Sequence, residues 1–496
     1  MKKRDFSLSI MIVLTFFGQL LSLVQSSRVA RIFGVSVEMD SYRLATSICA
    51  FFFGLFSAGI TTMLVPAYAK KNKRQANVFL TVSFSFLLLS SVIIILFRTP
   101  IISTITHQNA VLVQTAAKLV ILVATLELFK ALSTVSTAYY HCIGNHNIGK
   151  ILGLFTQTAL VLYIFFARNI TIFSYTWALW LLALISFLLH WTIAERKGMG
   201  FRIDFRSAAD PEVRTILYAF LPILLSEGID KLASFVDSMI AANLETGMIT
   251  ILSYSQMIVT MINSLLIVNL FSHEYPRIVA NIQEDKSQKL FWDKTIVFHT
   301  IVCLVFVAFV AGGKQAVEFL YLNPKFDQQA VNMLFTGAIL YLFGQQLNVI
   351  RDLIYRYFYA MQETKVTARN SILVNIVNII VSLILVFTIG FYGIILGTVV
   401  ASLVSLIVML VQFNKCFGFP EQIKSYIKKY FVNLLCAGIA ILGTLLLRQI
   451  MPDKIPLLLD LFLDVCIASV FYLVMEYLLN RTAVFQTLEL FFGKRA

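Results

Sequence analysis

Long runs of apolar residues alternate with short polar segments along nearly the whole chain. A helix needs about 20 apolar residues to cross the ~30 Å hydrocarbon core of a bilayer. Runs near this length predict an all-α polytopic membrane protein with about fourteen membrane-spanning helices. The predicted spans are 8–33, 41–69, 75–97, 110–143, 151–167, 174–194, 215–242, 247–276, 295–312, 328–361, 370–388, 392–414, 430–447 and 456–480.

Basic residues between the runs test the number of spans. If the N-terminus and every second loop face the cytoplasm, those segments hold 26 Lys and Arg, whereas the opposite loops hold 6. Lys and Arg collect in cytoplasmic loops, and a missed or extra span would reverse the bias further along the chain. The counts therefore favour fourteen spans with both termini in the cytoplasm.

The two halves of the chain echo each other at the ends of equivalent spans. The matching segments are VPAYAK (65–70) with EYPRIV (274–279), and AYYHCIGNHNIGK (138–150) with RYFYAMQETKVTAR (356–369). Echoes at equivalent points favour a parallel repeat of two six-helix bundles. The expected divisions are an N-terminal six-helix lobe (1–200), a C-terminal six-helix lobe (201–418) and two additional C-terminal helices (419–496).

Composition supports this class and excludes others. The chain is 59% hydrophobic and 13% charged, with a mean hydropathy of +0.83. Its net charge of +14 fits basic cytoplasmic loops better than nucleic-acid binding. Six scattered cysteines lack metal-ligand spacing, and no catalytic signature or ATPase motif is present. We therefore expect no enzyme, metal or cofactor, and transport driven by an ion gradient, the membrane potential or substrate turnover.

Ionisable residues inside the predicted spans are the candidate chemistry. Charge costs roughly 2.5 to 3.5 kcal/mol per residue at the centre of a spanning helix. Such residues therefore suggest a polar cavity, and snorkelling to the interface is the alternative for those near helix ends. The first two spans carry Arg28, Arg31, Asp40 and Arg43.

The seventh span carries the densest charge, with Glu227, Asp230, Lys231 and Asp237. A lipid-facing position is implausible for the face that holds the first three, so we expect them to line a cavity. An intrahelical pair of Glu227 with Lys231 is the alternative. In the fourth span, Glu127 and Lys130 are expected to pair on one helix face.

The first and seventh helices occupy equivalent points of the repeat. Placing them opposite each other brings both charge sets into one central cavity of mixed sign. Guanidinium groups match phosphate geometry, so a cationic rim suits an anionic, polar headgroup.

Several motifs resemble the MurJ/MviN family of the MOP exporter superfamily. They are ARIFG (30–34) followed by Asp40, VPAYAK (65–70) and FYAMQETKVTAR (358–369). The resemblance runs from about residue 10 to 415. It implies two six-helix lobes around a central cavity, alternating access, a bacterial cytoplasmic membrane location and export of an undecaprenyl diphosphate-linked glycan such as lipid II. It also implies that the last two spans help to form a groove for the lipid tail.

The chain departs from this family at expected substrate contacts. The resemblance implies cavity arginines on the first, second and eighth helices, but the matching residues here are Gln25, Phe53 and Gln256. A further arginine position on the first helix holds Gln19. Arg31, Asp40 and Asp237 fit the family. The departures imply either that Arg28, Arg43 or Lys231 substitutes, or that the cargo is a related polysaccharide or teichoic-acid precursor.

Four functions remain open at this stage. The leading hypothesis is a flippase for a lipid-linked glycan, and the second is a MATE-like exporter of cationic small molecules. The net sign of the cavity separates these two, and the sequence leaves it mixed. A glycosyltransferase would need catalytic carboxylates, for which the outer loop 312–329 is poor. A transport-dead scaffold would bind cell-wall or polysaccharide synthesis enzymes. Expected partners are otherwise the polyprenyl diphosphate-linked glycan and membrane lipid, with the protein a monomer.

Overall fold

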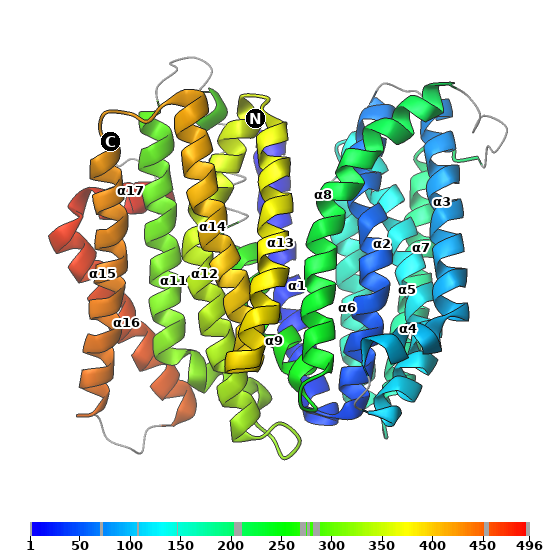
Figure 1. Cartoon of the computed structure of the whole chain (residues 1–496), viewed down its shortest axis with the longest axis horizontal. Helices are drawn as coiled ribbons and strands as arrows, with labels where there is room; N and C mark the ends of the chain where they lie inside the picture. The colour runs from blue at the N-terminus through cyan, green and yellow to red at the C-terminus, as the bar shows by residue number, and fades with distance from the viewer. Residues whose placement is uncertain are drawn as a thin grey trace. The chain divides into compact units, whose positions relative to one another are not determined.

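A computed structural model describes residues 2–69, 73–106, 109–145, 147–202, 211–267, 274, 278–280, 288–450 and 456–492. The chain folds into two compact units, Met1–Thr250 and Ile251–Ala496 (Figure 1). The repeat-based divisions at 1–200, 201–418 and 419–496 concern internal symmetry rather than packing, and they stay predictions.

The first unit contains the predicted first seven spans. Its helices are α1 (Lys2–Phe33), α2 (Val37–Ala69), α3 (Lys73–Leu96), α4 (Arg98–Ile105), α5 (Ala110–Cys142), α6 (Asn147–Phe166), α7 (Ile172–Arg196) and α8 (Pro211–Ala242). The short α4 lies in a segment that the apolar pattern assigned to a loop. Helix α9 (Met248–Ile262) begins in this unit.

The second unit contains the remaining predicted spans. After α9 its elements are a π-helical turn η2 (Asn263–Ile267), α11 (Lys289–Tyr321), α12 (Gln328–Ala360), α13 (Thr364–Ile389), α14 (Phe391–Phe417), α15 (Ile423–Arg448), α16 (Leu457–Leu479) and α17 (Arg481–Phe492). Eleven helices among the described residues are long and apolar enough to cross a membrane. The all-helical polytopic fold is therefore confirmed.

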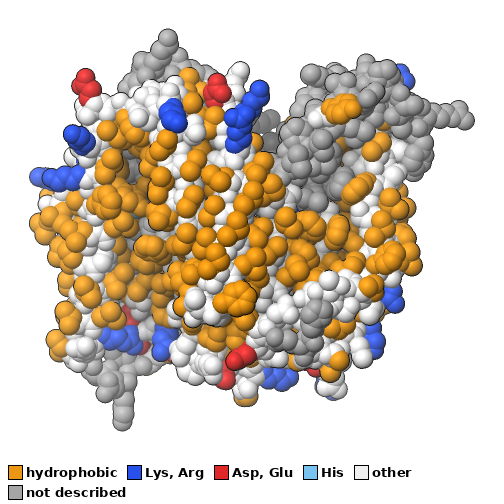
Figure 2. Space-filling view, viewed as in Figure 1, with side chains coloured by type: hydrophobic (Ala, Val, Ile, Leu, Met, Phe, Trp, Pro, Cys, Tyr) orange, Lys and Arg blue, Asp and Glu red, His pale blue; other side chains and the backbone are white. Residues whose placement is uncertain are grey.

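The surface of each unit fits this assignment. In Figure 2, apolar side chains cover the middle of the visible helices, and the visible Lys and Arg lie toward helix ends. Exposed side chains such as Phe387 (87%), Leu442 (62%) and Leu89 (58%) would be unfavourable in water and are suited to lipid.

The core of the first unit is the contact between α2 and α5. Alanines recur every seven residues on the buried face of α5, at Ala117, Ala124, Ala131 and Ala138. Small residues at this period let the backbones of membrane helices approach closely. The buried side chains of α2 are larger and include Phe53.

In the second unit, α13 and α14 form a closely packed hairpin. Gly393 and Gly397 on α14 are four residues apart, and a Cβ on Gly397 would lie 2.8 Å from the Cα of Ser382 on α13. This is the small-xxx-small geometry of tightly packed membrane helices.

Polar side chains fix α15 and α16 to α11 near both helix ends. Toward one end, Arg448 pairs with Asp460 and Asp464, and Gln315 on α11 donates to Asp464 at 2.7 Å. Toward the other, the buried cluster formed by His299, Thr300, Asn433 and Glu476 joins the same three helices.

Candidate functional site

The turn between α1 and α2 places the first predicted charge set. Gly34 has a φ of 61°, which allows the chain to turn after α1. The Ser36 hydroxyl then accepts from the Met39 amide at 3.3 Å and caps the start of α2. Asp40 and Arg43 thus lie in the opening turns of α2, while Arg28 and Arg31 lie in the closing turns of α1.

Asp40 is buried at 1% exposure and its carboxylate binds the start of α9. It accepts from the Gly247 amide at 2.5 Å, the Thr250 amide at 3.0 Å and the Thr250 hydroxyl at 2.6 Å. A negative charge at a helix N-terminus satisfies exposed amides and complements the helix dipole. This geometry gives Asp40 a structural role, and its contact with substrate stays a prediction.

Gln25 belongs to a cluster centred on Tyr175 of α7. The Gln25 amide donates to the Tyr175 hydroxyl at 3.2 Å, and the Tyr175 ring lies 5.7 Å from Tyr42 and 5.9 Å from Phe33. Tyr175 is 4% exposed. Gln25, which the resemblance predicts to stand in place of a family arginine, therefore forms a neutral hydrogen bond inside the first unit.

Gln256 repeats the same arrangement in the second unit. Its side-chain amide donates to the hydroxyl of Tyr341 on α12 at 3.0 Å. Phe53, at the third such position, is a core residue at 1% exposure. Of the three positions where the resemblance implies a cavity arginine, Gln25 and Gln256 each form a hydrogen bond with a tyrosine, and Phe53 is apolar.

The arginines of the first hairpin differ in their surroundings. The Arg28 guanidinium lies over the Phe165 ring of α6, with its Cζ 5.3 Å from the ring centroid. Such a contact lets an arginine remain charged within an apolar bundle. Arg31 is exposed and Arg43 is half-buried.

Lys231 lies beside the middle of α2. Its aliphatic stem packs against Gly54, because a Cβ built on that glycine would lie 3.1 Å from the Lys231 Cε. Gly54 is 17 residues from the start of α2 and 15 from its end, so this contact falls near the middle of a helix that the apolar pattern predicts to span the membrane. Because Gly54 has no side chain, it leaves room for the stem of Lys231. Lys231 as a whole is exposed.

The acidic residues of α8 are placed less uniformly. Asp230 is exposed and Asp237 is 3% exposed. The side chain of Glu227 lies outside the described residues, so its pairing with Lys231 is untested. The pairing expected on α5 is confirmed, with Lys130 Nζ 2.8 Å from Glu127 Oε1.

The predicted site residues of the first unit occupy two levels. Asp40, Arg43 and the Tyr175 cluster lie near the turn between α1 and α2, whereas Lys231 contacts α2 eleven residues beyond Arg43. At 1.5 Å per residue, these levels are separated by about 16 Å along α2.

Two polar clusters escaped the sequence analysis. In the second unit, Asn378 Oδ1 accepts from Ser382 at 3.1 Å and from Thr398 at 3.3 Å. In the same unit, His299 and Glu476 are fully buried and meet through Asn433. A polar residue inside an apolar run was the available signal, but Thr398 of α14 and Asn433 of α15 lie on helices other than those of Asn378 and His299.

Comparison with known proteins gives a consistent match. A family model described as "Lipid II flippase MurJ" matches residues 29–458. A curated relative from Helicobacter pylori, "Probable lipid II flippase MurJ", is 23% identical over 266 residues. That match covers 51% of this chain and spans 56% of the relative's length.

Solved structures share the fold. A lipid II flippase MurJ in an inward closed conformation matches with a TM-score of 0.79 at 18% identity, covering 95% of this chain and 98% of that one. An inward-facing multidrug resistance MATE transporter of the MOP superfamily matches with a TM-score of 0.64 at 14% identity, covering 81% and 94%.

Proposed function

Because this chain belongs to the MurJ family, we propose that it is a flippase that carries an undecaprenyl diphosphate-linked cell-envelope glycan precursor across the cytoplasmic membrane. The family is one of lipid flippases, which are transporters rather than enzymes. In our proposal, the glycan is lipid II or a related lipid-linked polysaccharide or teichoic-acid unit. In alternating access, the headgroup would pass through the protein while the polyprenyl tail stays in the bilayer.

One observation carries this proposal, namely the packing of the Lys231 side chain against Gly54 at the middle of α2, a helix that we predict to span the membrane. An ammonium group at this depth is costly unless an anionic partner or water compensates it. A diphosphate supplies such a partner through charge-assisted hydrogen bonds. Arg28 and Arg43 would provide further cations where the family arginine positions hold Gln–Tyr pairs or Phe53.

The membrane potential would suffice as a driving force for an anionic headgroup. Moving one elementary charge through 100 mV is worth about 2.3 kcal/mol. With the cytoplasm negative, the potential favours outward movement of the diphosphate. We place both termini in the cytoplasm, as the distribution of Lys and Arg supports. Coupling to an ion gradient is a further possibility in our proposal, with Asp237 as the candidate carboxylate.

The decisive experiment is depletion of the protein in its native cell, followed by analysis of the polyprenyl-linked glycans on the inner leaflet. Accumulation of lipid II identifies the family cargo, and accumulation of another lipid-linked repeat with lipid II unchanged identifies a related one. If neither accumulates, the flippase proposal is wrong.

A reconstituted assay tests the role of Lys231 directly. We expect Lys231→Ala to lose most headgroup translocation in proteoliposomes, and Lys231→Arg to retain part of it because the charge remains. Lys130→Ala is the matched control. Lys130 lies on α5, where its charge is already paired with Glu127, so its loss should leave translocation unchanged. Equal rates for Lys231→Ala and the parent protein would remove the lysine from the mechanism.

A MATE-like exporter is the second candidate function. The structural similarity to MATE transporters concerns the fold, and the buried carboxylate of Asp237 is the feature that favours it. This function predicts efflux of cationic dyes that Asp237→Asn abolishes. The flippase proposal predicts unchanged dye efflux when the protein is removed.

A further inference from the structure

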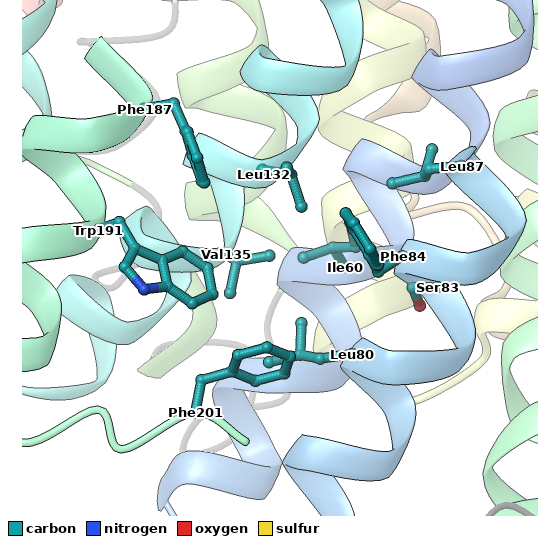
Figure 3. A pocket seen from close by; sticks show the side chains of 10 residues that line it. All are labelled: Ile60, Leu80, Ser83, Phe84, Leu87, Leu132, Val135, Phe187, Trp191 and Phe201. Carbon is teal, nitrogen blue, oxygen red and sulfur yellow. The ribbon is translucent and has the colours of Figure 1, made fainter. Parts of the chain in front are cut away.

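An apolar groove of about 180 Å³ lies in the first unit, apart from the predicted cavity residues. Figure 3 shows its walls: Ser83, Phe84 and Leu87 from α3 face Phe187 and Trp191 from α7. Its floor is formed by residues of α2 and α5. Both α3 and α7 pack against α5, and the groove separates them.

The groove occupies the depth of one bilayer leaflet. Its α3 residues run from Leu80 to Leu87, which is 7 to 14 residues beyond the start of α3 at Lys73. The apolar span of α3 begins at Ala76, and at 1.5 Å per residue the groove residues lie about 6 to 16 Å beyond it, from near one surface to about the middle of a ~30 Å hydrocarbon core. Exposed apolar side chains flank it, including Leu88 (45%) and Leu188 (50%).

The segment after α7 closes the end of the groove near the membrane surface. We call residues 197–202 the strap. The Tyr139 hydroxyl donates to the Lys197 carbonyl at 2.7 Å, and the Glu195 carboxylate accepts from the Phe201 amide at 3.0 Å. The Arg202 amide bonds the Asn77 side chain of α3 at 3.4 Å. The strap therefore runs from α7 to α3, and the Phe201 ring lines the groove.

Basic side chains surround this closed end. Arg196, Lys197 and Arg202 are exposed on or beside the strap, and Arg74 is exposed in the first turn of α3. Glu195 is engaged by the strap amides, since it also accepts from Gly200 at 3.2 Å. The groove thus combines an apolar interior with a cationic end at the membrane surface.

We propose that this groove binds one acyl chain of an anionic phospholipid, with the lipid phosphate at the basic residues of the strap. An apolar cavity of this size stays dry, because water there would lack hydrogen-bond partners. A void also loses dispersion contacts on its lining atoms, and a hydrocarbon chain restores them. Basic residues near the surface attract anionic lipids by about 1 kcal/mol each. The inference stands independently of the transported cargo.

Tryptophan fluorescence tests the proposal on the full chain. Trp191 lines the groove, whereas Trp177 on the same helix is 54% exposed. The protein would be placed in nanodiscs of phosphatidylcholine with increasing dibrominated phosphatidylglycerol, whose bromine atoms quench nearby indoles. The fluorescence of the parent protein minus that of Trp191→Phe gives the contribution of Trp191. The same subtraction with Trp177→Phe gives that of Trp177.

We expect Trp191 to be quenched saturably at low mole fractions of the brominated anionic lipid, while Trp177 follows bulk lipid composition. Replacing Lys197 and Arg202 with Gln should weaken this preference roughly fivefold per charge, the ratio equivalent to about 1 kcal/mol. Val135→Phe fills the groove and should make Trp191 follow bulk composition, with Trp177 quenching unchanged as evidence of folding.

Three outcomes would overturn the proposal. Identical quenching curves for both tryptophans would mean ordinary bulk lipid contact. Trp191 without quenching would mean a groove closed to lipid. Displacement of the brominated lipid by a lower concentration of undecaprenyl phosphate would assign the groove to an isoprenoid tail instead.

Discussion

Asp40 offers the sharpest test, because the sequence predicts that it lines a cavity, whereas in the structure its carboxylate caps the start of α9. In Asp40→Ala, the buried amides of Gly247 and Thr250 lose their acceptor. An unsatisfied buried donor costs about 1–3 kcal/mol, so the two amides predict a loss of about 2–6 kcal/mol. Asp40→Asn keeps one carbonyl oxygen, and about half of that loss is expected.

Cysteine labelling measures this loss within the folded protein. Cys49 on α2 is 0% exposed, and so are Cys303 and Cys436 in the second unit. A thiol reagent reaches these side chains when the structure opens, at a rate set by the opening free energy. A loss of 2 kcal/mol should accelerate Cys49 labelling about 30-fold. The second-unit cysteines should respond less.

Glu38→Ala is the matched control, since Glu38 is exposed in the same first turn of α2. Its effect should stay within about 0.5 kcal/mol. If Asp40→Ala labels Cys49 at the parent rate yet loses transport, the capping argument fails and Asp40 acts on the substrate.

Three further substitutions test local geometry. Gly247→Ala should accelerate Cys49 labelling, because Gly247 has a φ of 95° and a Cβ there would lie 2.8 Å from the Val35 Cβ. Gly397→Ala should lower the thermal midpoint through overpacking of about 1–3 kcal/mol, whereas Gly438→Ala, with open space around it, should leave the midpoint unchanged. Gln25→Leu should cost about 1–3 kcal/mol by orphaning the Tyr175 hydroxyl, and an unchanged midpoint would contradict that bond.

The fold was predictable because membrane spans are local signals. Thirteen of the fourteen apolar runs coincide with a helix, and the eighth coincides with α9 and η2 as far as Ile267, beyond which most of the run lies outside the described residues. The Glu127–Lys130 pair needed only a spacing of three residues. The eight-residue α4 and twelve-residue α17 were missed, since neither is long enough to produce a spanning apolar run.

The site was less predictable because its contacts join distant parts of the chain. Asp40 and its partner Thr250 are separated by 210 residues, so the sequence marks the carboxylate without its partner. Gly54 and Lys231 likewise lie on separate helices. An intramembrane charge signals that compensation exists, but only the fold distinguishes a helix cap from a side chain available to substrate.

The buried polar contacts of α11 have a consequence for biosynthesis. His299 lies 134 residues before Asn433 in the chain. At a synthesis rate of 5–20 residues per second, α11 waits roughly 7 to 27 s for α15 to emerge. During that interval its polar face needs temporary cover from the insertion machinery or from water. The second unit can therefore complete its core only after α15 and α16 have emerged, and a ribosome that stops before α16 leaves α11 without one of the helices that cover its polar side chains.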